Sequence, residues 1–179
     1  MNLANCLERL KIVKENIVTI KVDAIVNAAA PHLLGGAGVD GAIHKAAGPE
    51  LKAECITLGG CKTGEAKITK AYNLPCKYVI HTVGPVYNKD ELELQINQLK
   101  NCYINCFKLA KKHNIKSIAF PCIANGIYGF PIRISTKHVF DVCLNALNEN
   151  PELVVYLVCY NLTDFEKYVD YYVELKSNI

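Results

Sequence analysis

Long hydrophobic runs are missing from this sequence, which also contains no tryptophan and a single methionine. Its longest apolar stretch, Leu153–Tyr160, is far shorter than the roughly 20 residues that a membrane-spanning helix requires. The first residues, Met1–Lys11, lack the apolar core of a secretory signal peptide. We therefore expect a cytoplasmic protein that has no membrane partner.

A concentration of charge of one sign is also missing. The 20 lysine and arginine residues and 17 aspartate and glutamate residues leave a net charge of only +3, and the lysines are scattered along the chain. This slight excess is compatible with an anionic ligand, whereas nucleic-acid-binding domains usually carry a basic stripe or patch. We therefore expect no specific nucleic-acid partner.

No linker rich in proline, serine or glycine divides the 179 residues, and no repeat or low-complexity segment is present. The composition, 51% hydrophobic and 21% charged, is that of an ordinary globular protein. A chain of this length buries about 70% of its unfolded surface when it folds as one unit. We expect a single domain over residues 1–179, in a monomeric protein.

The nine cysteines include no Cys-x-x-Cys pair, and their number is odd. Cys102 and Cys106 lie four residues apart on an expected helix, so a contact of both thiols with a metal ion is one interpretation. Several of the cysteines fall within apolar runs, where the residue packs as a small hydrophobic side chain. Buried free thiols in a reducing compartment are the favoured interpretation, and we expect neither a metal nor a cofactor.

Short β-type runs alternate with stretches of helical periodicity along the whole chain. The expected strands are Leu10–Val13, Ala24–Ala28, Ala66–Ala71, Tyr78–Val83, Ser117–Cys122 and Val154–Tyr160. The expected helices are Val39–Ala47, Glu50–Leu58, Leu92–His113, Ser135–Asn148 and Thr163–Leu175, the last one begun by a capping box of Thr163 and Glu166.

This alternation predicts an α/β fold, a three-layer α/β/α sandwich with a mixed, mostly parallel central sheet. The central strands are continuously apolar, as strands covered on both faces should be. In such folds, ligands bind at the carboxyl ends of the strands.

The segment Ala24–Gly48 combines an apolar strand, a loop that contains Gly35, Gly36 and Gly38, and the start of a helix. Glycines let backbone N–H groups approach an anion, and a helix N-terminus adds its partial positive charge. A tight turn is the structural alternative, but a second loop of small residues at Asn125–Gly129 favours a diphosphate site. The spacing fits neither the dinucleotide-binding fingerprint nor the P-loop.

Three segments resemble macrodomains, the ADP-ribose-binding modules, and in particular the MacroD-type hydrolases. Ala24–Gly48 is similar to the first ligand loop of that family, V-N-A-A-N followed by L-x-G-G-G-G-V-D-G-A-I-H-x-A-A-G. Phe120–Pro131 is similar to the second phosphate loop, and Tyr78–Pro85 to the central strand. The matches occur in the family's order and cover most of the chain.

The resemblance implies an enzyme that binds ADP-ribose and ADP-ribosylated proteins. It implies hydrolysis of mono-ADP-ribosyl esters on acidic residues, or of O-acetyl-ADP-ribose, by an oriented water and without a metal. The resemblance assigns the reaction to Asp40, to Gly38 and to the position of Ala30. The structural alternative for Asp40 is a carboxylate stabilised by the helix N-terminus, and His44 is expected to pack rather than to catalyse.

The resemblance also implies a set of ligand-binding residues. Tyr160 would stack on adenine, Asn16 would accept a hydrogen bond from the adenine amino group, and Tyr128 would border the distal ribose. The remaining residues expected to bind the ligand are Ile17, Asn27, Ala28, Gly35, Gly36, Ala37, Val39, Ala124, Asn125, Gly126 and Ile127.

This chain departs from the family pattern at several positions. Ala30 replaces the last asparagine of N-A-A-N and so removes an amide beside the distal ribose. Ala37 replaces a glycine of the four-glycine run. Glu15-Asn16 replaces Gly-Asp, and Ala124-Asn125 replaces Ser-Thr in the second loop. We expect Ala30 to lower turnover.

Three other functions are alternatives. A module that binds ADP-ribose without turnover needs only the phosphate loops and the adenine site, and Ala30 is compatible with it. An RNA-binding domain is disfavoured because there is no basic patch or row of exposed aromatics. A nicotinamide-dependent oxidoreductase is disfavoured because the G-x-G-x-x-G fingerprint and its ribose-binding acid are missing.

Overall fold

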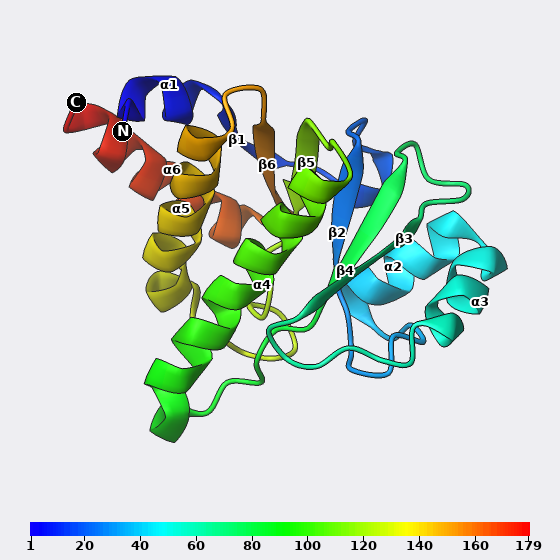
Figure 1. The fold of residues 1–179 in the computed structure, drawn as a ribbon. Helices are drawn as coiled ribbons and strands as arrows, with labels where there is room; N and C mark the ends of the chain where they lie inside the picture. Colours follow the sequence, from blue (N-terminus) through cyan, green and yellow to red (C-terminus); the bar gives the residue numbers. More distant parts are fainter.

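The computed structural model describes residues 1–179, and its centre is a six-stranded sheet in the order β1-β6-β5-β2-β4-β3 (Figure 1). The strands are β1 (Leu10–Lys14), β2 (Ala24–Ala28), β3 (Ala66–Lys70), β4 (Tyr78–Thr82), β5 (Ser117–Phe120) and β6 (Val154–Cys159). Every neighbouring pair is parallel except β3 and β4. The predicted mixed, mostly parallel sheet is confirmed.

Helices cover both faces of this sheet, so the predicted three-layer sandwich is also confirmed (Figure 1). One face carries α1 (Leu3–Glu8), α4 (Leu92–Lys112), α5 (Ile132–Glu149) and α6 (Leu162–Ser177). The other carries α2 (Gly38–Ala47) and α3 (Pro49–Thr57), together with the short 3₁₀ helix η1 (Ile17–Thr19). A second 3₁₀ helix, η2 (Lys89–Glu91), leads into α4.

The two faces of the sheet bury separate hydrophobic clusters, because alternate residues of each strand point to opposite sides. On the α4–α5 face, Phe120 of β5 stacks on Tyr103 of α4 with ring centroids 4.7 Å apart. Cys102 and Cys106 are both buried in α4 on this side. No group of three or more metal-ligating side chains lies close enough together to hold an ion.

Most helix ends differ from the prediction by one or two residues, and three differences are larger. Helix α1 was not expected, because six residues carry too little periodicity to be recognised. Helix α5 begins at Ile132, directly after Pro131, rather than at Ser135. The capping box predicted at Thr163 is wrong: Asn161 caps α6, and its side chain accepts a hydrogen bond from the Asp164 N–H at 2.8 Å.

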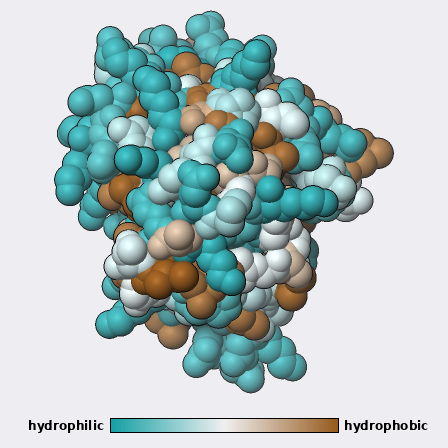
Figure 2. All heavy atoms as spheres, turned by 90° about the vertical axis from the view of Figure 1, so that its right-hand side faces the viewer, coloured by the Kyte–Doolittle hydropathy of each residue, from teal (hydrophilic) through white to brown (hydrophobic).

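The outer surface over α2 and α3 is mostly hydrophilic, and its apolar atoms form small groups separated by polar ones (Figure 2). None of the helices combines the length and the apolar character that crossing a membrane would require.

Candidate active site

A cleft of about 610 Å³ opens where the carboxyl ends of β2, β5 and β6 meet. Its walls come from the segments after these strands and from the start of α2. The lining side chains and backbone include Asn16, Ile17, Ala28, Ala30, Gly36, Ala37, Gly38, Val39, Asp40, Gly84, Cys122, Ala124, Gly126, Ile127, Tyr128, Tyr160 and Asp164. The volume is that of a cleft for a small-molecule ligand.

The loop between β2 and α2, residues 29–37, is called the first loop. It and the start of α2 offer a series of free hydrogen-bond donors. The backbone N–H groups of residues 35–40 donate to no acceptor within the protein, and the last three of them begin helix α2. Gly35 and Gly38 have φ values of +89° and +62°, a region that L side chains rarely adopt. Free amides at a helix N-terminus form a site for an anion.

The second loop, between β5 and α5, is closed by its own hydrogen bonds. The Phe130 N–H donates to the Ala124 carbonyl at 2.8 Å, and the Asn125 amide donates to the Phe130 carbonyl and the Ser135 hydroxyl. The backbone N–H groups of residues 126–128 stay free and lie along the cleft. Two rows of unpaired amides thus border one cleft, as a diphosphate requires.

An exposed aromatic ring stands at the β6 side of the cleft. Tyr160 directly follows β6 and is 83% exposed, so nothing within the protein covers its ring. On the same side, Ile17 is buried and Asn16 caps η1 by accepting a hydrogen bond from the Val18 N–H at 3.2 Å. A carbonyl oxygen accepts two hydrogen bonds, so Asn16 retains capacity for a ligand donor.

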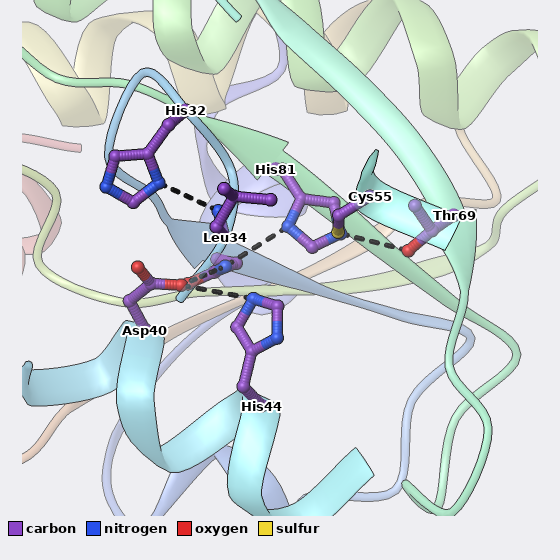
Figure 3. A network of polar contacts seen from close by, with 8 residues as sticks. His32, Leu34, Asp40, His44, Cys55, Thr69 and His81 are labelled. Atoms are coloured by element: carbon purple, nitrogen blue, oxygen red, sulfur yellow. Dashed lines mark hydrogen bonds and ion pairs between the residues drawn. The ribbon is translucent and has the colours of Figure 1, made fainter. Parts of the chain in front are cut away.

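Asp40 lies in the first turn of α2 and lines the cleft, although only 4% of it is exposed. Its Oδ1 accepts a hydrogen bond of 2.9 Å from the Asn27 amide (Figure 3). Its Oδ2 lies beside Gly36, where an added Cβ would be 3.1 Å away. Asp40 Oδ1 is therefore fixed by a hydrogen bond from the sheet, while Oδ2 faces the first loop.

His44 lies one turn after Asp40, and its Nε2 is 3.5 Å from Oδ1 of that carboxylate (Figure 3). This distance is an electrostatic contact but is too long for a good N–H···O hydrogen bond. Burial lowers the pKa of His44, against the opposing effect of Asp40. The imidazole is therefore predominantly neutral at neutral pH.

A buried polar network lies beneath the cleft. Asn27 of β2 and His81 of β4 are fully buried, and the Asn27 Nδ2 lies 3.1 Å from His81 Nδ1 (Figure 3). The other imidazole nitrogen, Nε2, lies 2.9 Å from the Thr69 hydroxyl and 3.7 Å from Cys55 Sγ. Burial, with a smaller contribution from the neighbouring His44, lowers the pKa of His81 to about 3.

Most of the residues that the sequence predicts for the site line this cleft, including Asp40, Ala30, Gly38 and Tyr160. Three others do not line it. Asn27 lies beneath the cleft in the buried network, Gly35 packs against the His44 ring, and the Asn125 side chain closes the second loop. Binding of the ligand by these residues stays a prediction.

The sequence analysis missed Gly84, Cys122 and Asp164, which line the cleft, and also His81, which lies beneath it. His81 bears most directly on Asp40. Its only signal was a histidine, followed by Thr82, within a strand whose other residues are apolar. A buried polar side chain must find a partner, so such an interruption in a central strand predicts a buried hydrogen-bond network.

Comparison with known proteins agrees with this geometry. The family model described as Macro domain matches residues 26–139. The chain is 44% identical over 168 residues to O-acetyl-ADP-ribose deacetylase 2 of Pantoea vagans, covering 91% of this chain and 98% of that protein. It is 56% identical over 142 residues to human ADP-ribose glycohydrolase MACROD2, covering 79% of this chain but 32% of that longer protein.

Solved structures give the same assignment. The macrodomain of Oceanobacillus iheyensis, solved with ADP, superposes with a TM-score of 0.89 at 39% identity and covers 95% of this chain and 93% of that one. The fold, the two amide-lined loops and the cleft define an α/β module for a nucleotide-like anion. The chain belongs to the macrodomain family.

Proposed function

We propose that this protein binds ADP-ribose and hydrolyses mono-ADP-ribosyl esters on acidic side chains, together with O-acetyl-ADP-ribose. The single observation that carries the proposal is the pair of loops with free backbone amides, which border one cleft beside the buried Asp40. The relatives named as an ADP-ribose glycohydrolase and an O-acetyl-ADP-ribose deacetylase support the same chemistry.

In this proposal, the diphosphate accepts hydrogen bonds from the amides of residues 36–39 and 126–128, and adenine lies against Tyr160. The distal ribose then lies near Asp40 and Ala30. Asp40 Oδ2 holds a ribose hydroxyl or orients a water, and the phosphate helps to activate that water. Water adds to the acyl carbonyl and the ester C–O bond breaks, which releases the carboxylic acid and free ADP-ribose. Positioning supplies most of the catalysis.

A second candidate function is ADP-ribose recognition without turnover. It is favoured by one observation, the alanine at position 30, which lines the cleft but has no side-chain group that hydrogen-bonds a ribose or a water. Both candidates require the two amide-lined loops, and they differ only in whether the distal-ribose end catalyses.

A turnover assay separates these two functions. We expect release of ADP-ribose from a protein that is mono-ADP-ribosylated on glutamate, and from O-acetyl-ADP-ribose. We expect EDTA to change neither turnover nor affinity, because backbone amides rather than a cation hold the diphosphate. Calorimetric titration with free ADP-ribose supplies the affinity. Binding without turnover would favour the recognition module, and loss of affinity in EDTA would contradict the metal-independent site.

Replacing Tyr160 tests the adenine side of the cleft. Tyr160→Ala is expected to weaken ADP-ribose binding by about 1–3 kcal/mol, because base stacking on an aromatic ring contributes about that much. The exposed ring supports little packing within the protein, so thermal stability is expected to stay unchanged. Tyr160→Phe is the matched control and should retain affinity. Unchanged affinity in Tyr160→Ala would show that the ring does not contact the ligand.

A further inference from the structure

The buried amide of Asn27 has only one orientation that suits its neighbours. Its Nδ2 lies 2.9 Å from the Asp40 carboxylate and 3.1 Å from His81 Nδ1, so its two hydrogens serve two acceptors. Its Oδ1 is buried without a partner. Turning the amide over would place this oxygen against the Asp40 carboxylate, so the unpaired carbonyl is the less costly arrangement.

This orientation determines the state of His81. Because Nδ1 accepts from Asn27, the neutral imidazole carries its hydrogen on Nε2, which donates to the Thr69 hydroxyl at 2.9 Å. Burial keeps the ring neutral at any pH well above about 3. The groups that face it are Asn27, Thr69 and the Cys55 thiol, with the His44 ring centroid 6.4 Å away.

The register of the sheet makes this contact rigid. Asn27 of β2 lies directly opposite His81 of β4 in a parallel pair, and both side chains are fully buried. Asp40 belongs to a different element, α2, and contacts this strand pair through Asn27 Nδ2 (Figure 3). The sheet interior is thereby connected to the Asp40 carboxylate, which lines the cleft.

We propose that His81 is a positioning residue: through Asn27 it holds Asp40 Oδ1, so that Oδ2 stays in place beside Gly36 at the wall of the cleft. This inference rests on the proposed hydrolysis, in which Asp40 orients a ribose hydroxyl or a water. With alanine at position 30, no amide from that side helps to align the reacting groups. The alignment of the reacting groups therefore depends more strongly on the series of contacts His81–Asn27–Asp40 than it would with asparagine at position 30.

Two amide substitutions separate positioning from packing. The carbonyl oxygen of His81→Asn stands near the place of Nδ1 and still accepts from Asn27, whereas His81→Gln reaches toward Thr69 and leaves Asn27 without that acceptor. We expect His81→Gln to lower kcat by about 10²-fold, the effect of misplacing a reacting group by about 1 Å. The dissociation constant for ADP-ribose should change little. His81→Asn should retain most of the native kcat.

Cys55→Ala is the control for packing, because it removes the Sγ contact with the His81 ring and leaves Nδ1 and Asn27 in place. It should lower thermal stability without lowering kcat. The positioning role is wrong if His81→Gln and His81→Asn lose kcat to the same extent. It is also wrong if the loss of kcat in each variant only follows its loss of thermal stability.

A readout that does not depend on turnover distinguishes a failure of the positioning role from a failure of the proposed hydrolysis. The Asn27 side-chain hydrogens should exchange slowly with solvent in NMR spectra of the native protein and of His81→Asn, and faster in His81→Gln. Equal exchange in all three proteins would overturn the positioning role even if turnover is robust. Slow exchange lost only in His81→Gln, without turnover in any variant, would support the network and reject the proposed hydrolysis.

Discussion

The Ala30→Asn variant is expected to hydrolyse ADP-ribosyl esters at least several-fold faster than the native protein. The new amide would lie at the distal end of the cleft, where it can hold the ribose or the attacking water. A single oriented donor near a developing charge is worth about 10²–10³ in rate. Ala30 is only half-buried, and its carbonyl already accepts from the Leu33 N–H at 3.0 Å, so the substitution leaves the turn intact.

The affinity for ADP-ribose should change little in the same variant, because the proposed diphosphate and adenine contacts lie elsewhere in the cleft. Initial rates with a glutamate-linked substrate and calorimetry with free ADP-ribose measure the two effects separately. Adding Asp40→Ala to this variant should lower the rate again. An unchanged rate would show that position 30 takes no part in the reaction, and a change in affinity alone would favour the recognition module.

Gly41→Ala is expected to damage both stability and binding. Gly41 lies in the first turn of α2, and a methyl group on its Cα would overlap the backbone carbonyl oxygen of Gly36. A clash with backbone cannot be relieved by rotating a side chain, so the first loop must move. Overpacking of this kind costs about 1–3 kcal/mol of folding stability. The displaced Gly36 amide would also leave the diphosphate, so ADP-ribose affinity should fall sharply.

Ala46→Gly is the matched control on the same helix. It lowers stability by roughly 0.5–1 kcal/mol through backbone entropy, while Ala46 lies outside the cleft. Chemical unfolding and calorimetry of both variants compare the two losses. If Gly41→Ala and Ala46→Gly retain the same affinity, the first loop tolerates the added methyl group, and the position of the Gly36 amide is not critical.

Much of the fold was predictable, because the central strands and long helices carry clear periodicity. In α4, Leu99, Tyr103, Cys106 and Ala110 recur at helical spacing, and all four are buried. The ends of elements were harder to predict, since caps depend on one or two side chains. Asn161 rather than Thr163 caps α6, and the sequence around them offers both.

The loops of the site were predictable for a different reason. A helix N-terminus leaves backbone amides without partners in the helix, and small residues before it let an anion approach them, so this local pattern indicated an anion site. The network beneath the loops was not predictable, because Asn27 and His81 are 54 residues apart in the chain and meet only through the register of β2 and β4. Strand pairing, rather than local spacing, determines which buried polar groups become partners.

The free amides of the two loops also affect how this site tolerates mutation. Where the backbone does not require glycine, every coded residue except proline supplies the same N–H, so an alanine such as Ala37 keeps its donor for an anion. The proposed distal-ribose end, near Asp40 and Ala30, depends instead on side-chain donors and acceptors. A single base change in the gene can remove one of these side chains. The proposed diphosphate site therefore tolerates more of the possible substitutions than the proposed distal-ribose end does.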